Sequence, residues 1–186
     1  MDITETLYVP TRGEWRAWLE AHFQSKGEVW LISYRVHTGI PSISYNDAVE
    51  EALCFGWIDS TRKGLDDERL AQRFSIRRPG AAYSQTNKER LARLRENGLL
   101  HPDNAAGLKD VRAEDFHIPE DIQAALQSDG AAWAFFQGTS LSYQRIRAAY
   151  VDHARKDTAE FEKRLAHLVA KCARGTPFGY GIERYY

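Results

Sequence analysis

Cysteine is scarce in this chain: the 186 residues include only two, Cys54 and Cys172, and they form no C-x-x-C pair. A disulfide scaffold or a cysteine-based zinc site needs more cysteines at closer spacing, so neither is predicted. The six histidines contain no H-x-x-x-H pair, and we predict no metal site and no resident cofactor. Cys54 follows Glu50 and Glu51 at a predicted helix end, which favours a buried structural thiol over a nucleophile.

Long hydrophobic runs are also absent. No window reaches the roughly 18 consecutive apolar residues of a membrane-spanning helix, and the first twenty residues hold Asp2, Glu5 and Glu14 without the apolar stretch of a secretory signal. We therefore expect a soluble, cytoplasmic protein with no membrane partner. The P-loop, G-x-S-x-G and protein-kinase motifs are missing as well, which removes the commonest recognisable enzyme classes.

The composition is that of a globular protein, with 43% hydrophobic and 27% charged residues. The net charge of −1 is unevenly distributed, because residues 61–95 carry ten basic and four acidic side chains while residues 1–60 are acidic. One basic segment therefore stands out as a candidate binding region.

The first 80 residues predict a mixed module with a small antiparallel sheet and two helices. Their signals are helical spacing of apolar residues, β-rich runs, and an acidic turn at residues 65–68 between two extended runs, which is typical of a β-hairpin. The expected elements are a helix over 12–25, a central strand over 28–36, a short strand over 42–44, a helix from Ser44 to Phe55, and hairpin strands over 57–64 and 69–77.

Beyond Pro79-Gly80 the strand signals nearly vanish, and the chain predicts only helices. The fold class is therefore α+β, with a mixed module over 1–80, an all-helical module over 81–174 and an aromatic tail over 175–186. Three interpretations of the tail stay open: it packs on its own chain, it forms the contact of a homo-oligomer, or it is a disordered terminus. The expected helix starts are Ser84, Asp103 or Asn104, Pro119 as the first helical residue, Asp129-Gly130, Ser140 and Asp157.

The hairpin and the helix before it gather the polar residues that form the first candidate site. Arginines on a strand can hold a carboxylate, phosphate or sulfate through paired hydrogen bonds, with an indole as a wall and neighbouring carboxylate or amide groups to orient them. The alternative is a solvated sheet face with cross-strand ion pairs. The predicted ligand-binding residues are Trp57, Asp59, Arg62, Gln72, Arg73 and Arg77, and the expected partner is a small anionic ligand or an acidic peptide group.

Two other functions remain open from the residues. An enzyme would use Asp59 or Glu51 as a general base, which requires a carboxylate pKa raised by burial. A nucleic-acid or protein interaction factor would use the basic segment 77–95, where Glu89 and Glu96 dilute the positive charge. The pI of about 6.6 argues against a dedicated nucleic-acid binder.

The central block is similar to a known family. The runs ALCFGWIDS (52–60), DDER (66–69) and QRF (72–74), which follow a strand and a Thr-Gly turn, resemble the bacterial YdeI/OmpD-associated family, also called bacteriocin-protection proteins. The resemblance covers roughly residues 8–174 and departs after Gly175. It implies a small bacterial cytosolic protein connected with tolerance of bacteriocins or other stress, and it carries over no catalytic residues.

Overall fold

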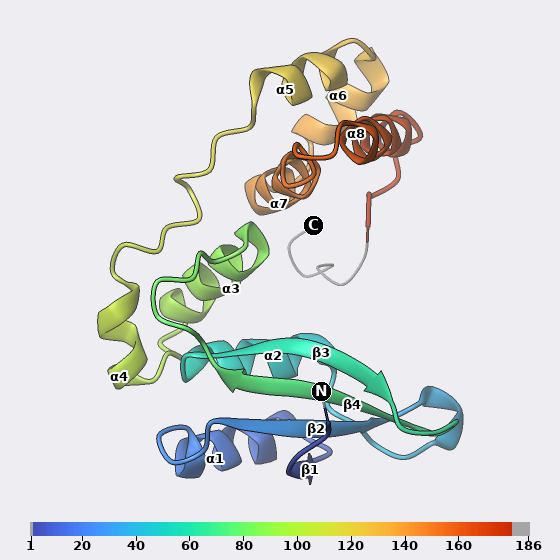
Figure 1. The fold of residues 1–186 in the computed structure, drawn as a ribbon. Helices are drawn as coiled ribbons and strands as arrows, with labels where there is room; N and C mark the ends of the chain where they lie inside the picture. Colours follow the sequence, from blue (N-terminus) through green and yellow to red (C-terminus); the bar gives the residue numbers. More distant parts are fainter. Residues whose placement is uncertain (1, 180–186) are drawn as a thin grey trace. The chain divides into compact units, whose positions relative to one another are not determined.

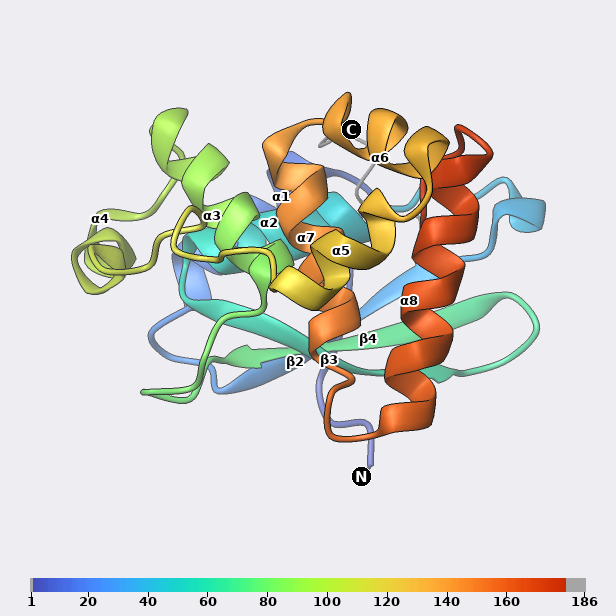
Figure 2. The same cartoon turned by 90° about the horizontal axis from the view of Figure 1, so that it is seen from above.

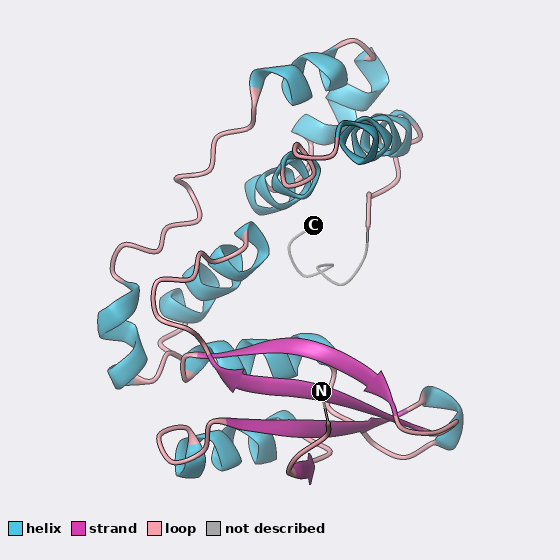
Figure 3. Cartoon of the chain, in the orientation of Figure 1, coloured by secondary structure: helices cyan, strands magenta, loops and turns pink. Residues whose placement is uncertain are grey.

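A computed structural model describes residues 2–179 of the chain, which divides into two compact units. Unit 1 comprises residues 1–82 and 90–111, and unit 2 comprises 83–89 and 112–186 (Figure 1). The sheet lies in unit 1, and the remaining elements of both units are helices, as Figure 3 shows. This arrangement confirms the predicted α+β class.

The sheet of unit 1 has the strand order β1-β2-β4-β3. Strands β2, β4 and β3 pair antiparallel, so the predicted hairpin and the predicted central strand are confirmed. The edge strand β1 pairs parallel to β2 and was not predicted. The strands are β1 (Thr6–Tyr8), β2 (Glu28–Tyr34), β3 (Trp57–Gly64) and β4 (Arg69–Ile76).

Two helices, α1 (Arg12–His22) and α2 (Tyr45–Cys54), pack on the sheet face that carries Phe74. The α1 side chain Trp15 is fully buried, and its ring centroid lies 5.3 Å from that of Phe74. Its indole Nε1 also donates to the carbonyl of Ala48 at 3.0 Å, which ties α1 to α2. The apolar spacing that predicted α1 therefore marks its buried face.

The segment between β2 and α2 differs from expectation in two places. Strand β2 ends at Tyr34, and Val36 begins a 3-10 turn (η1, Val36–Thr38) where it is 99% exposed rather than part of the strand. Ser42 does not open a second strand, because its hydroxyl accepts the backbone N–H of Tyr34 at 2.8 Å in place of a ladder partner. Ser44 caps α2 as predicted, accepting the N–H of Asp47.

Helix α3 (Gln85–Glu96) begins after Ser84 as predicted, and two later helix starts differ. The short helix α4 (Pro102–Ala105) is capped by His101, whose Nδ1 accepts the N–H of Asp103. Pro102, the first residue of the helix, has no N–H, so Asp103 supplies the first N–H that needs an acceptor. A second 3-10 turn, η2 (Ala106–Leu108), follows α4. Pro119 stands one residue before α5 instead of inside it.

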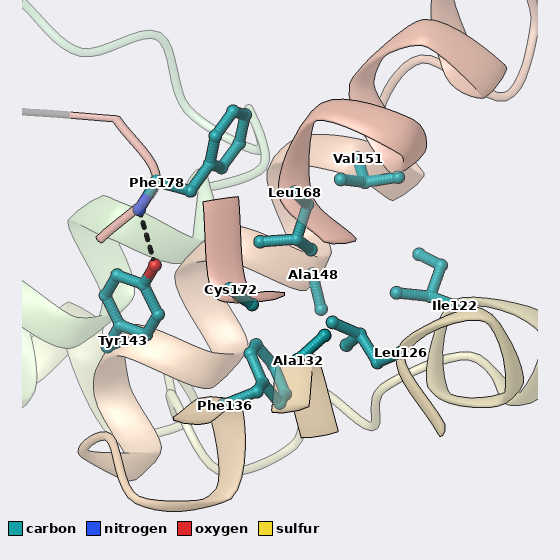
Figure 4. Packing of buried hydrophobic residues seen from close by; sticks show 10 residues of the cluster. All are labelled: Ile122, Leu126, Ala132, Phe136, Tyr143, Ala148, Val151, Leu168, Cys172 and Phe178. Carbon is teal, nitrogen blue, oxygen red and sulfur yellow. Dashed lines mark hydrogen bonds between the residues drawn. The ribbon is translucent and has the colours of Figure 1, made fainter. Parts of the chain in front are cut away.

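Unit 2 is built on α5 (Glu120–Gln127), α6 (Gly130–Gln137), α7 (Leu141–Asp152) and α8 (Thr158–Ala173). Asp129, Ser140 and Asp157 cap the last three of these as predicted. Helices α7 and α8 lie side by side in both views of the chain (Figures 1 and 2). The core between the helices contains Ile122, Leu126, Ala132, Phe136, Tyr143, Ala148, Val151, Leu168, Cys172 and Phe178 (Figure 4).

Phe178, from the predicted tail, is thus a core residue of unit 2 and is 5% exposed. Residues 180–186 lie outside the described residues, so a subunit contact through the tail stays a prediction. Within residues 2–179 no helix combines the length and apolar character that crossing a bilayer requires.

Candidate functional site

An irregularity in the hairpin decides which polar side chains meet. Asp59 of β3 pairs with Phe74 of β4, but the next pair is Arg62 with Gln72, so β3 has one more residue than β4 across this interval. Paired residues point to the same face of a sheet. The extra residue therefore places Arg62 on the face of Gln72, and Leu31 of β2 pairs with Gln72 in the same row.

A cleft of about 830 Å³ opens over this row. Its base is apolar, because Leu31, Ile43 and Phe74 are buried beneath it. The turn η1 and the first turn of α2 form its walls. The lining residues are Leu31, Ser33, Tyr34, Arg35, Val36, His37, Ile40, Ser42, Ile43, Tyr45, Ala48, Arg62, Leu70, Gln72 and Phe74.

The charged side chains that line this cleft are all basic. Arg35 and Arg62 contribute guanidinium groups, and His37 adds an imidazole, whereas no Asp or Glu is among the lining residues. Within residues 2–179 neither Arg35 nor Arg62 has an ion-pair partner. The Arg35 backbone is held in place, because its N–H donates to the carbonyl of Glu68 at 2.8 Å. The cleft therefore combines an apolar base with two unneutralised guanidinium groups.

Asp59 contacts one of the residues that line the cleft. The hydroxyl of Tyr45, a lining residue, donates to Asp59 Oδ2 at 2.8 Å. Partial burial, followed by the charge of Asp59 and this hydrogen bond, raises the pKa of Tyr45 to about 12, so its hydroxyl stays protonated at neutral pH. Asp59 is therefore linked to a lining residue of the cleft without lining it itself.

The other three predicted residues lie elsewhere in unit 1. Trp57 shares the sheet face of Arg62 but is 1% exposed, and its indole donates to the carbonyl of Phe23 at 3.2 Å. Arg73 lies on the opposite face, where its Nε donates to Glu28 at 2.9 Å. Arg77 follows the end of β4. The structure therefore brings together Arg62 and Gln72, keeps Asp59 near them, and separates Trp57, Arg73 and Arg77 from this group.

Glu51, the other candidate base, lies in an ionic cluster between α1 and α2. It is 2% exposed, and each of its carboxylate oxygens accepts from an arginine, at 2.5 Å from Arg12 and 2.7 Å from Arg16. Removal of either arginine would leave this buried carboxylate with one partner fewer. A proton-transfer role for Glu51 would require one of these ion pairs to break.

Cys54 lies one turn beyond Glu51 and is fully buried. Burial, with the charge of Glu51 beside it, raises the pKa of the Cys54 thiol to about 11 even though Arg16 acts in the opposite direction. A protonated, buried thiol is a poor nucleophile. No three His, Cys, Asp or Glu side chains in the described part of the chain gather in a way that could hold a metal ion.

The arginines of the basic segment 77–95 have intramolecular contacts on α3. Arg90 is 5% exposed rather than solvated, and it donates to Asn46 Oδ1 at 2.7 Å. Arg95 donates to the carbonyl of Leu108 at 2.6 Å. These contacts join residues 90–96 of α3 to the rest of unit 1, and a nucleic-acid role for this segment stays a prediction.

Two of the basic and aromatic residues that line the cleft, Arg35 and Tyr45, were not among the predicted site residues. Arg35 directly follows the last residue of β2, and Tyr45 is the first residue of α2. Functional side chains are frequent at such element ends, because loops held by a rigid scaffold present them to ligands. That position is the signal that could have identified both.

Two family models match the chain. Residues 7–107, more than half of the sequence, match a family described as a domain of unknown function, DUF8412. Residues 115–175 match the family described as bacteriocin-protection, YdeI or OmpD-associated, which confirms the predicted family, although the block over 30–74 falls within the first match. Comparison with curated proteins and with solved structures gave no match. The chain therefore belongs to the DUF8412 family, and its C-terminal part matches the bacteriocin-protection, YdeI or OmpD-associated family.

Proposed function

We propose that unit 1 binds a small organic anion in the cleft over Arg62 and Gln72. The observation that carries this proposal is the pairing of an apolar base with two guanidinium groups that have no carboxylate partner within the described residues. A guanidinium group suits a carboxylate because its donors form parallel hydrogen bonds. The ligand therefore has an aliphatic or aromatic body and one carboxylate.

The cleft supports this ligand class by its size as well as its lining. Its volume of about 830 Å³ lies within the range of small-molecule sites, about 300–1,000 Å³. Gln72 supplies a neutral amide beside Arg62, and its Nε2 already donates to the carbonyl of Ser60 at 3.3 Å. The amide oxygen is available to accept a hydrogen bond from a ligand hydroxyl or amine.

Benzoate and hexanoate are suitable probes, with acetate as the matched anion that lacks an apolar body. Binding is measured by isothermal titration calorimetry on the full chain, and thermal unfolding supplies a second readout. A ligand at a hundredfold over its Kd stabilises the folded state by about 2.7 kcal/mol. We expect one of the two larger anions to bind more tightly than acetate, since only they bury apolar surface on the base of the cleft.

Arg62→Gln and Arg35→Gln test the anion contacts. Each is expected to weaken binding about tenfold, the loss typical of one charge-assisted hydrogen bond. Arg78→Gln is the matched control, because Arg78 is exposed and does not line the cleft. No saturable binding of any of the three anions, or an equal loss in all three variants, would contradict the proposal.

Enzymatic use of the cleft is the alternative, with Asp59 as a general base in contact with Tyr45. Turnover of a bound carboxylate, detected by product analysis and abolished in Asp59→Asn while binding persists, would favour this alternative over binding alone.

A further inference from the structure

A second cleft lies wholly within unit 2, between α7, α8 and the segment that follows α8. Its volume is about 550 Å³. The α8 residues that line it recur every three or four positions, so they share one side of the helix, while Leu168 and Cys172 on the other side enter the core. The lining residues are Arg147, Tyr150, Glu160, Lys163, Arg164, His167, Lys171, Pro177, Phe178 and Gly179.

This cleft is strongly basic. It contains four Lys or Arg side chains and His167 against a single carboxylate, Glu160. That carboxylate is already engaged, because Arg164 Nε donates to it at 2.8 Å and Lys163 Nζ lies 3.4 Å away. Lys171 forms no ion pair within residues 2–179. Lys163, Arg164 and Lys171 alone therefore carry three positive charges against the one carboxylate of Glu160.

The two guanidinium groups of the cleft are also held in position. Arg147 is 7% exposed, and its guanidinium carbon lies 5.6 Å from the Tyr143 ring centroid and 5.8 Å from that of Phe178. The Arg164 guanidinium stacks 4.2 Å above the Tyr150 ring and donates to the Tyr150 carbonyl at 3.0 Å. Side chains fixed in this way lose little conformational entropy when they bind an anion.

We infer that this cleft binds a small molecule that carries a phosphate monoester. A phosphate monoester has a charge of about −1.5 to −2 at neutral pH and three acceptor oxygens, which suits a cleft lined by several cations better than a carboxylate does. Guanidinium groups and a lysine ammonium are the usual protein partners of phosphate. Tyr150 is 44% exposed, and its ring offers an apolar surface to the organic part of the ligand.

Phenyl phosphate is the probe, with inorganic phosphate and phenylacetate as the matched anions that lack the ring and the phosphate. Each is titrated into the full, isotopically labelled chain and followed by two-dimensional NMR. We expect saturable shifts that concentrate in residues 147–179 and that are stronger for phenyl phosphate than for phenylacetate. This location distinguishes the site from the cleft of unit 1, whose residues all precede Ile76.

Lys171→Gln tests the charge directly, because Lys171 has no ion pair among the described residues. It should weaken phenyl phosphate binding about tenfold, and Lys163→Gln provides a second variant at the other end of the cleft. Lys156→Gln is the control, since Lys156 is exposed between α7 and α8 and lies outside the lining, and it should change Kd less than about twofold.

Three outcomes would overturn the inference. The first is the absence of saturable shifts with phenyl phosphate, and the second is an equal loss of affinity in Lys171→Gln and Lys156→Gln. The third is binding to a single-stranded oligonucleotide that grows with strand length while phenyl phosphate does not bind, which would assign the basic surface to nucleic acid instead.

Discussion

The hydroxyl of Tyr143 accepts a hydrogen bond from the backbone N–H of Phe178 at 2.7 Å, with both residues buried in unit 2 (Figure 4). Tyr143 lies in the first turn of α7, whereas Phe178 lies five residues beyond the end of α8. This hydrogen bond therefore connects the segment after α8 to α7. It also places the Phe178 ring beside Arg147 in the basic cleft.

Tyr143→Phe should loosen this segment. The substitution keeps the ring but leaves the buried N–H of Phe178 without its acceptor, a loss of about 1–3 kcal/mol. Hydrogen exchange at the Phe178 amide should accelerate accordingly, and the free energy of unfolding of unit 2 should fall. Tyr150→Phe is the control, because no hydrogen bond of the Tyr150 hydroxyl is present in the described chain. An unchanged exchange rate at Phe178 in Tyr143→Phe would show that the bond does not hold the segment.

Glu89 has an equally well-defined environment. Its carboxylate is 3% exposed and accepts four hydrogen bonds, two from Arg145 and one each from Gln85 and Ser142. Burial alone would favour the protonated form, but these hydrogen bonds outweigh it, and the pKa of Glu89 lies below its ordinary value of 4.5. Because the pKa of Glu89 is lower in the folded state than in the unfolded state, its ionised carboxylate stabilises the folded state at any pH above the unfolded-state pKa. This stabilisation is lost as the pH falls through the folded-state pKa.

Glu89→Gln should therefore reduce both the stability of unit 2 and its acid sensitivity. Removal of one partner from a buried ion pair costs about 3–5 kcal/mol, and partial exposure of Arg145 places the expected loss toward the lower end of that range. Urea denaturation at pH 7 measures the loss, and a series below pH 4.5 should show a flatter decline for the variant than for the wild type. The exposed Glu162→Gln should match the wild type in both.

Both cysteines should resist alkylation in the folded protein. Burial raises the pKa of the Cys172 thiol to about 11, and Cys54 reaches the same value in its own buried position. At pH 8 the reactive thiolate is therefore scarce as well as inaccessible. We expect iodoacetamide to label neither residue over the time in which it labels both in urea, with the adducts counted by mass spectrometry. Rapid native-state labelling of Cys54 alone would restore it as a candidate nucleophile.

The helix starts of this protein were predictable because their causes are local. Ser44, Ser140 and Asp157 each accept a backbone N–H three residues ahead, which is a pattern visible in the sequence. The strand β1 was not predictable in this way. It has only three residues, and its pairing with β2 is decided by the tertiary fold rather than by its own sequence.

The candidate site was predictable only in part for the same reason. The hairpin sequence indicated a polar strand pair, but the register depends on the extra residue between Asp59 and Arg62, which no turn or glycine signal marks. With that residue, Arg62 faces the cleft beside Gln72. Arg73 follows Gln72 in β4 and therefore points to the other face of the sheet. There it donates to Glu28, a partner 45 residues away in the sequence. Such a long-range ion pair has no local signature.

Gly179 lies in the predicted aromatic tail, and its surroundings predict a specific effect of substitution. Its φ is +76°, and a Cβ built there would lie 2.5 Å from the nearest Arg147 nitrogen. Gly175 has a similar φ of +63°, but its nearest neighbour is a Phe135 ring carbon at 4.0 Å. The two glycines therefore share the backbone requirement and differ in the space available to a side chain.

Gly175→Ala should cost about 1 kcal/mol of unfolding free energy, the usual penalty of a left-handed conformation for alanine. Gly179→Ala should cost more and should also displace the Arg147 guanidinium, because two heavy atoms cannot remain 2.5 Å apart. Urea denaturation measures the difference in stability, and the Arg147 side-chain NMR signals report the displacement. If Gly179→Ala behaved like Gly175→Ala in both measurements, the close approach of this backbone to Arg147 would have no role in shaping the basic cleft.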